Sequence, residues 1–137
     1  MRDHTYDDLL REFNTNPPSD DLEANHFQEK TGIELPSDYI EFLKYANGGE
    51  GFIGENSYCM LWKLGELTEL NSAYEAKEYA PGLLLFGSNG GGEAYAFDTE
   101  ASPWRIVQVP FVGMSRDLIE VLAPNFNDFL KYLYDAE

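Results

Sequence analysis

Apolar residues recur at helical spacing in several stretches of this chain, and the residues around those stretches favour helix ends. In the clearest case, residues 36–47, the side chains Tyr39, Phe42, Leu43 and Ala46 form one apolar stripe. Proline and short polar residues precede the stripe, and Asn-Gly-Gly, which tolerates a left-handed backbone, follows it. Similar signals predict helices at residues 5–13, 19–31 and 125–134, and a less regular helical pattern covers residues 64–79.

The middle of the chain changes to short apolar runs separated by turn residues, which is typical of strands. We expect strands at residues 52–54, 58–62, 83–86, 93–98 and 106–109, with a glycine-rich turn at 87–92. The pattern predicts an α+β fold, in which a single domain over residues 1–137 has a mainly antiparallel sheet, helices packed on one side, and helices at both termini. The expected buried core contains Tyr39, Phe42, Leu43, Trp62, Phe86 and Phe129.

The net charge of the chain limits which classes of partner are expected. Twenty-five acidic and nine basic residues give a formal net charge of −16. The basic residues are scattered, so nucleic acid and anionic membrane surfaces are disfavoured as partners. Two explanations of the acid excess stay open: colloidal solubility, and attraction of a basic protein. The acidic N-terminal stretch is unlike a signal peptide and no apolar run is long enough to span a bilayer, so we expect a cytoplasmic protein.

The residue types that carry catalysis or bind cofactors do not occur here in a recognised arrangement. The single cysteine, Cys59, lies in an apolar strand pattern and fits a buried, unreactive thiol. His4 and His26 lack partners at the spacing of a zinc site, so we expect no metal and no cofactor. The turn at residues 87–92 has no Gly-Lys-Ser/Thr step and leads into a strand at Glu93, which favours a hairpin over a phosphate-binding loop.

Acidic residues are dense in the helical pattern that follows Trp62. One interpretation is a solvated helix face, and the other is a docking face for a basic partner, with Trp62 and Tyr74 as anchors. The candidate partner-binding residues are Glu66, Glu69, Glu75 and Glu78.

Several motifs follow one another in a distinctive order. The stretch Gly32-Ile33-Glu34-Leu35-Pro36-Ser37-Asp38-Tyr39 opens a helix that ends in Asn47-Gly48-Gly49. An aromatic strand with Trp62, a glycine turn that begins at Gly87, a strand that ends at Asp98, and a final helix that begins near Phe126 come next. Over nearly the whole chain this order resembles the SUKH superfamily. One departure is Gln28, where many relatives carry an acid. The signature residues carried by the resemblance are Gly32, Leu35, Pro36, Tyr39, Asn47, Gly48, Trp62, Gly87, Asp98 and Phe126.

The resemblance implies a function in protein binding, not in catalysis. SUKH members include bacterial immunity proteins, and many of the toxins paired with them resemble nucleases, whose substrate-binding faces are basic. The first hypothesis is therefore a cytoplasmic immunity protein that neutralises a basic toxin. The alternative is a protein-interaction scaffold that resembles the superfamily's fungal cell-wall regulator and has no toxin partner. An enzyme ranks third.

Overall fold

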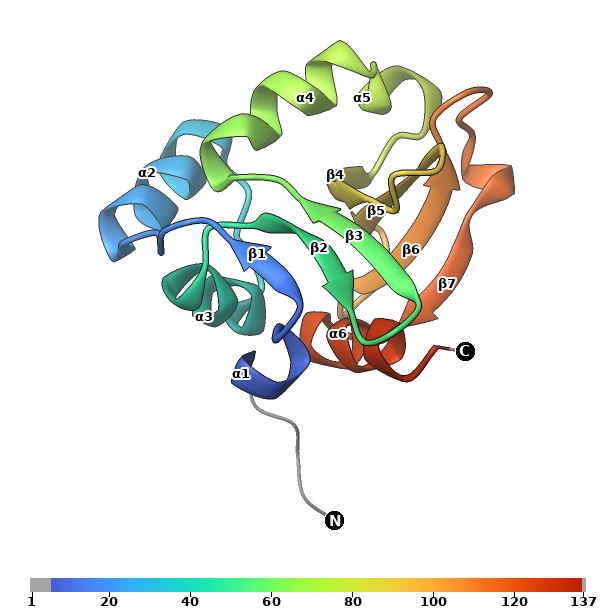
Figure 1. Ribbon diagram of the computed structural model, residues 1–137. Helices are drawn as coiled ribbons and strands as arrows, with labels where there is room; N and C mark the ends of the chain where they lie inside the picture. Colours follow the sequence, from blue (N-terminus) through green and yellow to red (C-terminus); the bar gives the residue numbers. More distant parts are fainter. Residues whose placement is uncertain (1–5, 137) are drawn as a thin grey trace.

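Seven strands form one antiparallel sheet in which the order of strands follows the order of the chain (Figure 1). The structure, a computed structural model, describes residues 6–136. Each strand pairs antiparallel with the next. The strands are β1 (Phe13–Thr15), β2 (Gly49–Ile53), β3 (Ser57–Leu61), β4 (Leu83–Ser88), β5 (Glu93–Asp98), β6 (Arg105–Pro110) and β7 (Glu120–Ala123).

The longer helices begin where capping side chains are available. Asp20 accepts a hydrogen bond from the Glu23 N–H and caps α2, and Asn125 accepts one from the Asp128 N–H and caps α6. The α-helices are α1 (Tyr6–Leu9), α2 (Asp21–Thr31), α3 (Ser37–Tyr45), α4 (Leu67–Ala73), α5 (Ala76–Tyr79) and α6 (Phe126–Asp135), with 3₁₀ turns η1 (Leu64–Glu66) and η2 (Arg116–Leu118). In the described part of the chain, no helix has both the length and the apolar character that a membrane span requires.

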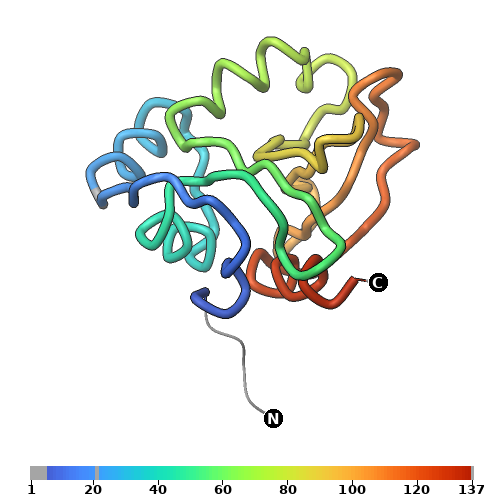
Figure 2. The backbone as a smooth tube through the Cα atoms, in the orientation of Figure 1, coloured from blue at the N-terminus to red at the C-terminus, as the bar shows by residue number. Residues whose placement is uncertain are grey.

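The strands β4, β5 and β6 are covered on both faces, which differs from the predicted one-sided packing. On one face, α1, α2, α3 and α6 enclose the larger core, which contains Leu84 and Phe86 of β4. On the other face, α5 and the segment around Met114 cover Leu83 and Leu85 of the same strand. Figure 1 shows α4 and α5 across the sheet from α1 and α6, and Figure 2 shows α1 and α6 side by side. The α+β class, the antiparallel sheet and the terminal helices are confirmed.

Aromatic rings fill the larger core. The Tyr39 ring lies 5.0 Å from Phe97 and 5.1 Å from Phe126 between centroids, and Phe86 lies 4.6 Å from Phe97. Five of the six predicted core residues are buried: Tyr39, Phe42, Leu43, Phe86 and Phe129. The sixth, Trp62, is half-buried, because it follows β3 at the boundary between the two cores.

Three parts of the chain differ from the sequence prediction. The first helix ends at Leu9, and Phe13, which was expected in it, pairs with Gly51 as the start of edge strand β1. The segment after β6 forms β7, which was not predicted. The helical pattern at residues 64–79 divides into η1, α4 and α5, because Glu75 adopts a left-handed backbone with φ 54°.

Candidate functional site

The segment from Gly32 to Asp38 forms one wall of a groove, and its backbone is held by side chains of neighbouring elements. Gly32 ends α2 with φ 73°, a conformation that favours glycine. The Leu35 N–H then donates to Oε1 of Gln28 at 2.8 Å. The side-chain amide oxygen of Gln28 is the acceptor in this contact, and it therefore fixes the extended stretch before α3.

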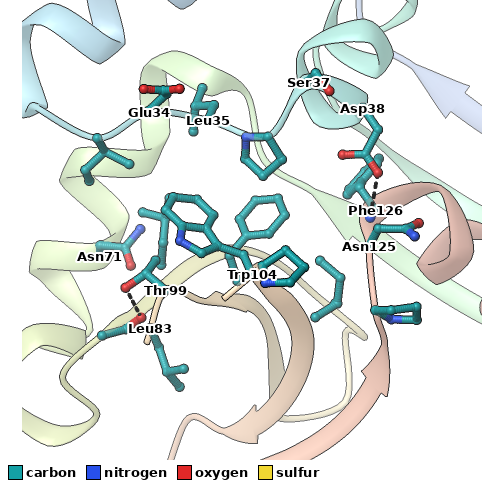
Figure 3. Close-up of a pocket in the computed structure, with 18 of the residues that line it drawn as sticks. Glu34, Leu35, Ser37, Asp38, Asn71, Leu83, Thr99, Trp104, Asn125 and Phe126 are labelled. Atoms are coloured by element: carbon teal, nitrogen blue, oxygen red, sulfur yellow. Dashed lines mark hydrogen bonds between the residues drawn. The ribbon is translucent and has the colours of Figure 1, made fainter. Parts of the chain in front are cut away.

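Asp38 joins this wall to the opposite one. Its carboxylate oxygen Oδ2 accepts hydrogen bonds from the N–H groups of Phe126 at 2.9 Å and Asn127 at 3.1 Å. These are free N–H groups of the first turn of α6, where a negative charge is also favoured by the helix dipole. Asp38 thus holds the starts of α3 and α6 in fixed relation, as Figure 3 shows.

Between these walls lies a groove of about 1530 Å³. Its lining includes the apolar residues Leu84 and Phe97 of the sheet and Trp104 from the β5–β6 connection, together with the charged residues Glu34 and Lys77. Figure 3 shows Trp104 and Glu34 among the residues that line it. The described lining residues include no histidine and no cysteine. A groove of this size and composition suits an extended peptide segment or an apolar side chain of a partner.

The signature residues Asn47 and Gly48 hold the junction between α3 and η1. The Asn47 Oδ1 atom accepts from the Leu64 N–H at 2.8 Å, and its Nδ2 donates to Glu23 at 3.4 Å. Gly48 has φ 77°, and a Cβ there would collide with the carbonyl oxygen of Leu61. Both residues thus have a structural role at this junction. The remaining signature positions are structural in the same sense: Leu35, Tyr39 and Phe126 are buried, Pro36 precedes α3 as its cap, and Gly87 lies against the carbonyl of Met60.

Asp98 is buried with 1% of its side chain exposed and binds two arginines. Arg116 Nη2 donates to both carboxylate oxygens at 3.0 and 3.1 Å, and Arg105 Nε donates to Oδ2 at 3.1 Å. Burial alone would raise the pKa of Asp98, but the hydrogen bonds from Arg116, from the Glu100 N–H and from Arg105 outweigh it and leave the pKa below its ordinary value. The network fastens the segment at residues 115–118 to the end of β5.

The four candidate glutamates lie on exposed positions of one helical segment, and only some of them have a local structural role. The Glu66 carboxylate accepts from the Lys63 N–H at 3.0 Å and closes η1. Glu75 is the left-handed residue between α4 and α5, and Glu69 and Glu78 are exposed on those helices. The four glutamates are therefore exposed one after another along η1, α4 and α5.

Comparison with known proteins identifies the family. The model of the SMI1 / KNR4 family (SUKH-1) matches residues 18–132. The chain belongs to this family. It is also 31% identical over 90 residues, 66% of its length, to a Bacillus subtilis (strain 168) protein described as "Uncharacterized protein YnaB". The match spans 57% of that relative's length.

The sequence patterns of this SMI1/KNR4 chain do not predict the groove. Its contributors lie far apart in the sequence, at α3, α4, the β5–β6 connection and α6. One local signal was available: Pro103-Trp104 places a large aromatic residue in a short connection between two strands, where a half-exposed tryptophan often marks a binding surface.

The two histidines and the single cysteine are the residues that the sequence analysis considered for metal binding. His26 lies exposed on α2, and His4 lies outside the described residues. Cys59 is fully buried in β3, and burial raises the pKa of its thiol. Among residues 6–136, no three histidine, cysteine, aspartate or glutamate side chains converge in a way that could hold a metal ion.

Proposed function

We propose that this protein is an immunity protein that binds and neutralises a basic, nuclease-type toxin. The SUKH-1 match over residues 18–132 carries the proposal, since the superfamily that the sequence resembles includes bacterial immunity proteins. The net charge of −16 supplies the sign of the partner, because an acidic protein attracts a cationic cleft and suppresses contact with other acidic proteins.

Binding, not catalysis, is the activity that the geometry supports. The lining of the groove combines apolar residues with amides, hydroxyls and a few charges of both signs, and Cys59 is buried in the larger core, away from solvent. The Asp98 carboxylate accepts hydrogen bonds from Arg105 and Arg116, and these bonds hold two segments of the fold together. We therefore assign no catalytic residue and no cofactor.

We place the electrostatic part of the contact on α4 and α5. Glu69, Glu75 and Glu78 are exposed there. Charge at such positions changes the rate of encounter with a partner while contributing little to folding.

The first experiment tests immunity itself. Cells that express the toxin gene adjacent to this gene in its genome should survive only when this protein is co-expressed. Death of the cells despite soluble protein would contradict the proposal, and absence of any toxin gene beside it would favour the scaffold alternative.

The second experiment tests the location of the charge. We compare Glu69→Lys/Glu75→Lys/Glu78→Lys with a control that carries Glu12→Lys, Glu29→Lys and Glu55→Lys, all exposed glutamates on other elements. Each substitution adds two charges, so both variants change from −16 to −10. Association rates with the toxin, measured at two salt concentrations, should fall more in the first variant and should fall with salt in the wild type. Equal rates in the two variants would refute the location, and a salt-independent rate would refute the electrostatic account.

A further inference from the structure

A second exposed surface lies on the same side of the sheet as α4. We define the β3 aromatic face as Phe52, Tyr58, Met60, Trp62, Tyr74 and Phe111. We propose that this face binds an arginine-bearing segment of a basic protein partner. The proposal rests on the proposed function for the partner's charge, and adds the surface and the side chain that is recognised.

Strand alternation builds the first half of the face. Cys59 and Leu61 of β3 point into the larger core, so Tyr58 and Met60 point to the opposite side of the sheet. In the neighbouring strand, Phe52 pairs with Tyr58, and their rings meet edge to face with centroids 5.5 Å apart. Phe52 keeps 44% of its surface exposed.

A column of rings builds the second half. The Trp62 and Tyr74 rings lie nearly parallel, at 12°, with centroids 6.1 Å apart. On its other side Tyr74 contacts Phe111, with centroids 4.5 Å apart. The Phe111 N–H donates to the Gly92 carbonyl, which fixes the column beside the glycine turn. Gly90 of that turn lies against the Tyr58 ring and the Met60 sulfur, so the turn joins the two halves.

This part of the sheet is left open by the way the helices are placed. The same side of β4, β5 and β6 is covered by α5 and by the segment around Met114. On β2 and β3 the corresponding side remains accessible, and Tyr74 at the end of α4 is 42% exposed. Beside Phe111, Val112 is 91% exposed. A continuous apolar and aromatic surface of this kind is uncommon on a protein without a binding partner.

Charge complementarity selects the occupant. Glu50 pairs with Met60 across β2 and β3, so it lies on the aromatic face, where it accepts a hydrogen bond from the Tyr58 hydroxyl. Glu75 follows Tyr74 directly. Flat rings beside carboxylates fit an arginine, whose planar guanidinium stacks on aromatic faces and donates to carboxylates at the same time. A second copy of this chain is disfavoured on this face because each copy carries a charge of −16.

The test uses two probes of equal charge, nona-arginine and nona-lysine peptides. The two peptides carry the same charge, so the ratio of their dissociation constants reports what the guanidinium adds, namely stacking on rings and bidentate hydrogen bonds to carboxylates. The change of that ratio in Tyr74→Ala isolates the part due to stacking on Tyr74. We expect nona-arginine to bind several-fold more tightly to the wild type, with NMR shifts concentrated on the aromatic face. The substitution Tyr74→Ala should weaken nona-arginine binding about three- to tenfold and remove most of its advantage over nona-lysine, whereas Tyr74→Phe should retain it.

The matched control is Tyr132→Ala. Tyr132 is 46% exposed on α6, which covers the other face of the sheet, so its loss should leave both affinities unchanged. Equal affinity of the two peptides, shifts spread over the whole acidic surface, or an unchanged ratio in Tyr74→Ala would overturn the proposal. A dimer in light scattering that is dispersed by Tyr74→Ala would overturn it in favour of a second copy as occupant. Thermal melting confirms that each variant is folded.

The outcomes separate this inference from the proposed function. If co-expression protects cells from the toxin and Tyr74→Ala protects equally well, the immunity function stands and the aromatic face is refuted as the contact. If the arginine preference maps to the face but no toxin is neutralised, the face stands as a binding surface and the immunity function fails.

Discussion

Asp98 gives the sharpest prediction about stability, because a buried carboxylate is held between two arginines that reach solvent. Arg105 and Arg116 are 41% and 27% exposed, whereas Asp98 is 1% exposed. The perturbations are Asp98→Asn, which removes the charge with little change of size, and the double substitution Arg105→Gln/Arg116→Gln, which removes both cations.

The two perturbations differ in what they leave behind. Asp98→Asn leaves two arginines that can recover hydration, so the loss is that of hydrogen bonds to a charged group, about 2–4 kcal/mol of unfolding free energy after partial compensation. The double arginine variant leaves a buried carboxylate without a cation, which costs about 3–5 kcal/mol. We therefore expect the arginine variant to be the less stable of the two at pH 7.

The pH dependence has a definite sign. The pKa of Asp98 is lower in the folded protein than its ordinary value of 3.8, so ionised Asp98 stabilises the fold above that value. This contribution is lost as the pH falls from the ordinary value through the lower pKa of the folded protein. The stability gap between the wild type and Asp98→Asn should therefore be largest at pH 7 and shrink steadily below pH 5.

Urea denaturation followed by far-UV circular dichroism at pH 7, 5, 4 and 3 measures these differences. If Asp98→Asn is as stable as the wild type at pH 7, the arginine contacts do not stabilise the fold. If the gap does not shrink on acidification, the difference does not arise from the Asp98 charge.

Further predictions concern the core and the backbone. Phe42 is fully buried, so Phe42→Ala should lower the unfolding free energy by about 3–5 kcal/mol in urea denaturation. Among residues 6–136, the buried Tyr39 hydroxyl has no hydrogen-bond partner, so Tyr39→Phe should leave the melting temperature unchanged or raise it. A loss of unfolding free energy above about 1 kcal/mol would indicate a bound water. Gly48→Ala should cost more than Gly32→Ala, since both have positive φ but only Gly48 is confined by neighbouring carbonyls. Cys59→Ala should leave partner binding intact, and elemental analysis of the purified protein should find no stoichiometric zinc.

Sequence patterns predicted the elements whose local signals agree with their packing. The helices at residues 19–31 and 125–134 carry a capping side chain, and the stripe on α3 places Phe42 and Leu43 in the core. The strand at residues 93–98 was predicted with its exact bounds, since a turn precedes it and buried residues fill it. In these elements, local propensity and tertiary contacts favour the same structure.

The errors occur where tertiary contacts decide. Phe13 continues a helical apolar stripe in the sequence, but in the fold it pairs with Gly51 at the edge of the sheet. In β7, two of the four residues are exposed, and the strand forms because β6 pairs with it, which no local pattern reveals. The left-handed backbone of Glu75 divides α4 from α5 without a glycine or proline to mark the break.

The second covered face of the sheet has a physical explanation that links fold to site. The strands β4 and β5 are buried along almost their full length, because the helices of the larger core cover one face and α5 with the segment around Met114 covers the other. Once α5 covers β4 through β6, α4 reaches back toward β3, and Tyr74 at its end meets Trp62. The half-buried state of Trp62 follows from this placement: the residue expected in the core instead stands where the covered part of the sheet ends and the aromatic face begins.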